Sequence, residues 1–172
     1  MFNIATSFNQ DLNNWNVSSV TNMEGMFRTA YDFNGKIGDW NVSSVNDMSY
    51  MFQQTSFNQD ISNWNVSNVT SMFWMFGYTT SFNQDLSLWN VTAVTNMSYM
   101  FLRSEIFNSD ISKWDVSSVT NMQAMFTWAA KFNADISEWN VSKVTDMSNM
   151  FKGATEFNQN LTQWCVRKIT AV

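Results

Sequence analysis

Residues 82–106 read FNQDLSLWNVTAVTNMSYMFLRSEI, and the same pattern returns along the whole chain. A Phe-Asn pair opens each copy, a Trp follows seven residues after the Phe, and a Met-Phe pair lies further on. The opening residues are Phe8, Phe33, Phe57, Phe82, Phe107, Phe132 and Phe157, and the tryptophans are Trp15, Trp40, Trp64, Trp89, Trp114, Trp139 and Trp164. The spacing is 25 residues, apart from one step of 24. The chain therefore consists of seven copies of one repeat.

Two apolar periods alternate inside the repeat. Trp15 and Val17 are two residues apart, which is typical of a short strand with one buried face. Further on, apolar residues recur every three to four positions, at Val20, Met23, Met26, Phe27 and Ala30. This second spacing predicts an amphipathic helix, for which Ser18 and its equivalents are candidate N-caps.

One strand and one short helix cannot bury their own apolar faces, whereas a stack of such units can. We therefore expect an α/β repeat fold, a leucine-rich-repeat-like solenoid of about seven 25-residue rungs. Each rung contributes one short parallel strand plus one short helix. The whole chain, residues 1–172, forms a single solenoid domain, with like side chains of successive rungs lying over one another in columns.

The composition excludes several functional classes. The net charge is −5 and no basic patch is visible, so we expect no nucleic-acid partner. No stretch is apolar for long enough to cross a membrane, and the segment carries no signal peptide. The chain has no His, a single Cys and no glycine-rich phosphate loop. We therefore expect no enzyme, with no catalytic residues and no cofactor or metal site.

The repeat is similar to that of the BspA-like leucine-rich-repeat surface proteins, in the subgroup found in bacterial and mycoplasma surface lipoproteins. The residues that carry the resemblance are Met26-Phe27, Phe33-Asn34, the segment from Phe82 to Val91, and the segment from Val94 to Phe101. The resemblance covers almost the whole chain. It implies a solenoid at the cell surface or outside the cell, used in adhesion or other protein recognition, and it implies no catalytic residues.

The two ends depart from the repeat. Residues 161–172 lose the Met-x-x-Met-Phe segment, which predicts the start of a C-terminal cap. Met1-Phe2 enters the repeat at its midpoint, so we expect the chain to be part of a longer one.

Three columns of side chains have a structural and a functional interpretation. The Asn after each opening Phe is expected to bond turn backbone as an internal ladder. The Asp column is expected to bond its own turns, with Ca²⁺ between stacked carboxylates as the alternative. Its members are Asp11, Asp60, Asp85, Asp110 and Asp135, with Lys36 and Asn160 in the same register. The Met-x-x-Met pairs have the spacing of soft-metal sites, but core packing accounts better for them.

Residues that depart from the repeat consensus are the candidates for partner binding, since the shared ones build the scaffold. Helical spacing places Tyr50, Trp74 and Tyr99, the third residues of successive Met-x-x-Met motifs, on the outer face. The other candidates are Tyr78, Leu102 and Trp128. We expect an outward aromatic stripe that forms an interface. The alternative is that these rings fill grooves between helices.

A second candidate surface is the variable column before each Trp: Asn14, Asp39, Asn63, Leu88, Lys113, Glu138 and Gln163. Its mixed charges suit both a solvated face and a recognition surface.

The sequence thus predicts a non-catalytic protein-binding or adhesion solenoid of a cell-surface or secreted protein, with a protein partner. The alternative is a structural scaffold subunit that is permanently embedded in a larger assembly.

Overall fold

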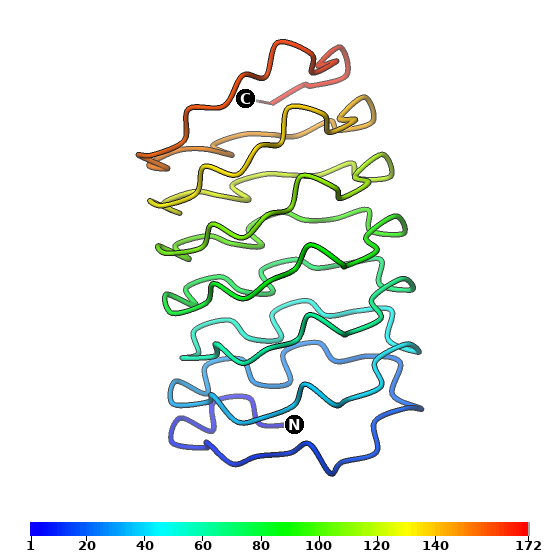
Figure 1. Cartoon of the computed structure of the whole chain (residues 1–172), viewed down its shortest axis with the longest axis vertical. Coiled ribbons are helices and arrows are strands. Elements are labelled where there is room, and N and C mark those ends of the chain that lie inside the picture. The colour runs from blue at the N-terminus through cyan, green and yellow to red at the C-terminus, as the bar shows by residue number, and fades with distance from the viewer. Residues whose placement is uncertain (172) are drawn as a thin grey trace.

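The computed structural model describes residues 1–171. It is a stack of coils that climbs from the N-terminal to the C-terminal end, with each repeat forming one coil (Figure 1). Within these residues there is no helix, and strand pairing is limited to isolated parallel bridges. The bridges join Asn22, Asp47, Ser71, Asn96, Asn121, Asp146 and Ala171 in succession. The copies do stack, but the predicted α/β fold, a leucine-rich-repeat-like solenoid with one strand and one helix in each rung, is wrong.

A series of tight turns replaces the predicted helix. In the first full coil, the N–H of Trp15 donates to the carbonyl of Leu12 and that of Val20 to Val17, both at 2.9 Å. The N–H of Met26 donates to Met23 at 3.2 Å in the same way. The apolar residues that recur in every repeat thus lie at the first or the last position of a turn whose ends are three residues apart. The periodicity that predicts a helix arises here from consecutive turns.

Bonds between coils explain why no helix forms. The N–H groups of Met97, Tyr99, Phe101 and Arg103 donate to carbonyls of the next coil at 2.8–3.0 Å. The intervening residues donate within their own coil, as Met100 does to Met97 at 3.2 Å. Every second N–H thus points along the stack, which satisfies the backbone without any helical bond. A helix would direct all of these groups along the chain instead.

The predicted strand lies in the wrong part of the repeat. No bridge forms at Trp89 to Val91 or at the equivalent residues among those described. Asn90 accepts the N–H of Thr92 at 3.2 Å, and the turn from Val91 to Val94 follows directly. This Asx-type turn bends the chain where a strand would have to continue. The predicted N-caps accordingly close turns and do not begin helices.

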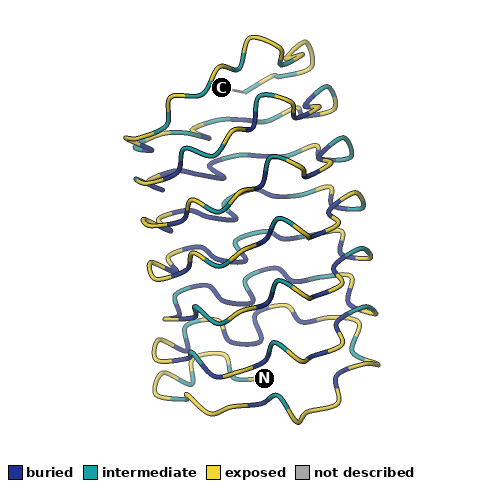
Figure 2. Cartoon of the chain, viewed as in Figure 1, coloured by how far each residue is buried: buried dark blue, intermediate teal, exposed yellow. Residues whose placement is uncertain are grey.

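Columns of like side chains fill the interior of the stack, as the sequence predicts. Phenylalanines of the Met-Phe pairs follow one another from Phe27 to Phe151 with ring centroids 5.5–6.0 Å apart. Within a coil, the two rings lie closer, at 3.7 Å for Phe27 and Phe33. Met48, Met51 and the equivalent methionines of the central coils are fully buried, which confirms that the Met-x-x-Met pairs are core residues (Figure 2).

The C-terminal residues continue the stack. The indole of Trp164 donates to the carbonyl of Ile136 at 3.0 Å, and the N–H of Thr170 donates to Thr145 at 2.9 Å. Residues 161–171 thus follow the path of the preceding coils, although Val166 is 51% exposed. Val172, the last residue of the predicted cap, lies outside the described residues, and the cap stays a prediction.

Candidate interaction surface

Four aromatic side chains from three successive coils form one stack, here named the aromatic stack: Tyr50, Trp74, Tyr78 and Tyr99. The ring of Trp74 lies 6.5 Å from that of Tyr50, 5.0 Å from Tyr99 and 5.9 Å from Tyr78, with interplanar angles of 20°, 13° and 7°. Phe73 meets Tyr50 and Tyr99 edge-on, at 5.0 and 5.9 Å. Such pairs contribute roughly 0.5–1.5 kcal/mol each beyond the area that they bury.

Two arginines extend the aromatic stack. The guanidinium carbon of Arg28 lies 4.6 Å from the ring centroid of Tyr50. Arg103 lies between Tyr78 and Trp128, with distances of 5.6 and 5.8 Å to their centroids. These separations are within the range of cation–π contacts. The surface therefore runs continuously from Arg28 to Trp128 along the long axis of the molecule.

The backbone turns these side chains outward. The third residue of each Met-x-x-Met motif and the residue four positions later have left-handed conformations. The first set includes Tyr50 (φ 59°), Trp74 (φ 57°) and Tyr99 (φ 60°), and the second includes Tyr78 (φ 61°) and Trp128 (φ 60°). This conformation costs roughly 1–2 kcal/mol for a residue other than glycine. Of the six exposed or half-buried aromatic residues of this surface, all but Phe73 occupy strained positions.

Two glycines make room for the indole rings. A Cβ atom at Gly77 would lie 2.5 Å from the ring of Trp74, and one at Gly153 would lie 2.3 Å from the ring of Trp128. Gly153 is in the coil that follows Trp128. Any side chain at either position would displace the tryptophan, so these glycines fix where the two rings lie.

The predicted binding residues differ in how far they are exposed. Tyr50, Trp74 and Tyr99 are half-buried, while Tyr78 and Trp128 are 38% and 45% exposed. Leu102 is only 8% exposed and lies largely inside. Phe73, Arg28 and Arg103 also belong to this surface and are not predicted from the sequence. Phe73 departs from the consensus next to Trp74, which is the one signal that could have identified it.

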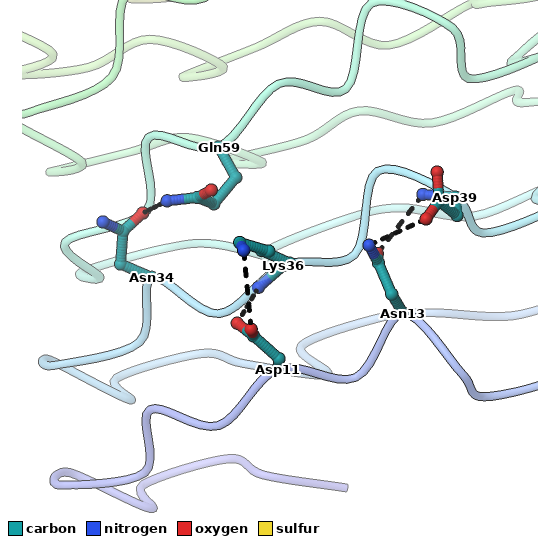
Figure 3. A network of polar contacts seen from close by, with 6 residues as sticks. All are labelled: Asp11, Asn13, Asn34, Lys36, Asp39 and Gln59. Atoms are coloured by element: carbon teal, nitrogen blue, oxygen red, sulfur yellow. Dashed lines mark hydrogen bonds and ion pairs between the residues drawn. The ribbon is translucent and has the colours of Figure 1, made fainter.

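The Asn column bonds one coil to the next. The side-chain carbonyl of each Asn accepts the backbone N–H of the next Asn at 2.8–3.1 Å, from Asn9 to Asn158. Asn34 also accepts from the amide of Gln59 at 3.0 Å (Figure 3). The predicted backbone-bonding role is confirmed. The ladder lies at the surface, however, since Asn83 and Asn108 are exposed.

Four members of the Asp column close turns within their own coil: Asp60, Asp85, Asp110 and Asp135 each accept the N–H of the residue two positions on, at 2.8–3.0 Å. Asp110 accepts the N–H of Ser112 at 2.9 Å, and this backbone bond, helped by the Ser112 hydroxyl, lowers the pKa of Asp110. Equivalent bonds lower the pKa values of Asp60 and Asp135. Asp11 pairs with Lys36 of the next coil at 3.9 Å (Figure 3). The predicted bond to the residue's own turn is thus confirmed for Asp60, Asp85, Asp110 and Asp135, whereas Asp11 accepts the backbone N–H of Lys36 in the next coil at 2.9 Å. No three His, Cys, Asp or Glu side chains of the described part gather as a metal site.

The column before each Trp is a polar surface with one apolar interruption. Leu88 is 76% exposed. A groove of about 410 Å³ lies beside Lys113 and Glu138, between Asp110 and Asp135.

Comparisons with known proteins give one match. No curated protein and no solved structure matches the chain. No helix among residues 1–171 has the length and apolarity needed to cross a membrane. A family model described as "Mycoplasma protein of unknown function, DUF285" matches residues 1–105 and 74–172, which together span the chain. The protein therefore belongs to this mycoplasma family.

Proposed function

We propose that this chain is a non-catalytic binding module of a cell-surface or secreted protein, and that it recognises a protein partner through the aromatic stack and its neighbours Arg28, Arg103 and Trp128. The supporting observation is that five aromatic side chains reach the surface from strained left-handed positions. Neither the core nor the coil-to-coil bonding requires rings there. Exposed aromatic and arginine side chains are enriched where proteins meet.

The surface location rests on the resemblance to BspA-like surface proteins, together with membership of the mycoplasma family. The absence of His from the whole sequence supports the non-catalytic part of the proposal, because it removes the usual general base.

A permanent scaffold subunit is the second candidate function. Leu88 and Ile106 are 76% and 45% exposed on other parts of the coils, so apolar side chains reach the surface in more than one place. Sedimentation at high salt distinguishes the two candidates. A soluble monomer supports the binding module, while a stable complex that survives high salt supports the scaffold, because apolar interfaces resist screening.

The direct test is affinity capture. The purified chain is the bait, and the sample is the set of surface-exposed proteins of cells to which the cell that carries this protein attaches. The variant Trp74→Asn/Tyr99→Asn removes two rings while keeping the left-handed backbone, which Asn149 already adopts at the same position (φ 59°). Leu88→Ser/Glu138→Gln is the matched control on the column before each Trp. We expect the first variant to lose the captured partner and the control to retain it. Equal recovery with both variants would exclude the aromatic stack as the binding surface.

A further inference from the structure

The ring faces of the aromatic stack are already occupied. Trp74 lies between Tyr50 and Tyr99, and Arg28 covers the ring of Tyr50. A ligand that binds by stacking, such as a sugar ring or a nucleobase, finds few open faces. What the surface presents outward is ring edges, which carry the positive part of the aromatic quadrupole.

Hydrogen-bond donors on this surface lack partners. In the core, six tryptophans donate their indole N–H to a carbonyl of the preceding coil at 2.8–3.3 Å. Among the described residues, the indoles of Trp74 and Trp128 make no such bond. Arg28 and Arg103 likewise make no ion pair there, since the two pairs present involve Lys36 and Lys131. A guanidinium stacked on a ring still has its N–H edge available for a carboxylate.

The free positive charge of this surface comes from its two arginines. The six segments that carry the aromatic stack and its neighbours run from the first Met of each Met-x-x-Met motif to the residue seven positions later. They contain Arg28, Arg103, Lys152 and one carboxylate, Glu24, with Asp47, Glu105 and Asp146 directly beside them. Because the whole chain has a net charge of −5, an acidic ligand is attracted to the two arginines that make no ion pair among the described residues, and is repelled by much of the rest of the molecule.

We propose that the partner presents an acidic, extended peptide segment to this surface, with carboxylates at Arg28 and Arg103 and an apolar side chain against the ring edges between them. This inference rests on the proposed function and names the chemistry of its partner. The two arginines are three coils apart, about 14 Å at roughly 4.8 Å per coil. An extended peptide covers that distance in about four residues, and residues i, i+2 and i+4 point to the same side.

A polyanion fits the surface less well than a peptide. Nucleic-acid binding relies on many phosphate contacts made by clustered cations. Here the arginines are far apart and the chain as a whole is negative.

The test uses fluorescence anisotropy with a labelled peptide, Glu-Ser-Leu-Ser-Glu, flanked by neutral residues. The control peptides are Lys-Ser-Leu-Ser-Lys and a shortened Glu-Leu-Glu. Protein variants are Arg103→Gln and Arg28→Gln, with Lys143→Gln as the matched control for loss of one positive charge away from the surface. Unchanged thermal melting of each variant verifies that it is folded.

We expect the acidic peptide to bind the wild-type chain, with a roughly ten-fold loss for either arginine variant and none for Lys143→Gln. The basic peptide should not bind, and the shortened one should bind more weakly. Absence of acidic-peptide binding, or equal binding of the basic peptide, would overturn the inference. So would tighter binding of oligouridylate or of anionic lipid vesicles with the same arginine dependence, since the site would then be a general anion site.

The failure of this inference is distinguishable from that of the proposed function. If the acidic peptide does not bind but Trp74→Asn/Tyr99→Asn abolishes partner capture, the protein-binding function stands and the acidic partner does not. If capture is unaffected by that variant, the function proposed for the surface falls as well.

Discussion

At the scale of single residues, the left-handed backbone positions are the most unusual feature of this chain. Gly25 and Gly153 occupy two of them, as expected for residues without a Cβ. Tyr, Trp, Thr, Gln, Arg and Ala occupy others, at a conformational cost. The bonding between coils maintains this conformation, because alternate N–H groups must point along the stack.

Replacement of Ala124 by Gly should stabilise the fold. Ala124 has φ 52° and is only 5% exposed. Relief of the left-handed strain outweighs the added backbone entropy of Gly in the unfolded chain, for a net gain of about 0.5–1 kcal/mol. Thermal or urea denaturation measures the change. Ala129→Gly is the control, since Ala129 is fully buried without a positive φ, and it should lower the stability by about 1 kcal/mol. A loss of stability in both variants would contradict the strain described for Ala124.

The turn-closing aspartates should make the stability depend on acid pH. Backbone N–H bonds from Ser62, Ser112 and Ser137 lower the pKa values of Asp60, Asp110 and Asp135 from 3.8. A lowered pKa in the folded state stabilises the fold above pH 3.8, and this contribution disappears as the pH falls through the lowered values.

Replacement of all three aspartates by Asn should reduce the loss of folding stability at acid pH, because Asn accepts the same bond without titrating. Asn160 already does so, accepting the N–H of Thr162 at 3.0 Å. Urea denaturation at pH 7 and at pH values below 3.8 measures the effect. The corresponding triple Ala variant removes the acceptors and should be less stable at both pH values. If the stability of the Asn variant falls as steeply at acid pH as that of the wild type, other titrating groups control the acid dependence.

At the scale of the coil, one apolar spacing is compatible with two backbone structures. Residues such as Met23 and Met26 share a face when they are three apart in a helix, and they also do so when they open and close a turn. The amino-acid composition of the segment does not distinguish the helix from the series of turns. Bonds to carbonyls of the next coil decide between them, and those bonds are not encoded in any one repeat.

The repeat pattern nevertheless determined much of the fold. Seven aligned copies of the Phe, Trp and Met-Phe positions predicted the stack and its buried columns correctly. Departures from the consensus identified Tyr50, Trp74, Tyr78 and Tyr99, which the structure brings into contact. Arg28 and Arg103 were missed because a cation–π contact depends on the ring that a neighbouring coil supplies.

The absence of helix should be visible in solution. We expect a far-UV circular dichroism spectrum without the double minimum of α-helices, because turns and isolated bridges form the described coils. Heating to the unfolded state provides the control spectrum. A helical spectrum of the native chain would contradict the coil structure directly.

The Asn ladder should contribute measurably to the bonding between coils. Asn83→Ala removes the acceptor for the N–H of Asn108, now paired at 2.8 Å, and should cost about 1 kcal/mol in urea denaturation. Asn158→Ala is the matched control, because the side chain of Asn158 accepts no bond from the described residues and its own N–H bond is retained. Equal losses in the two variants would show that the ladder bond itself adds nothing.

At the scale of the whole molecule, each coil contacts only its neighbours, so the stability depends on interfaces between coils. Phe101 is fully buried, with Phe76 and Phe126 at 5.6 and 5.8 Å on its two sides. Phe157 has an equivalent neighbour only at Phe132, 5.8 Å away, and is partly buried. Loss of the central ring therefore weakens two interfaces at once, whereas loss of the terminal ring weakens one.

Phe101→Ala should accordingly cost about 3–5 kcal/mol and Phe157→Ala clearly less. In a stack with nearest-neighbour contacts, the central substitution also separates the coils before it from those after it. Hydrogen exchange should show that Phe101→Ala no longer unfolds in a single cooperative transition. Phe157→Ala should retain the single transition and expose only the last coil. If both variants unfold in one step with equal loss of stability, the molecule behaves as one globular core and not as a stack of coupled coils.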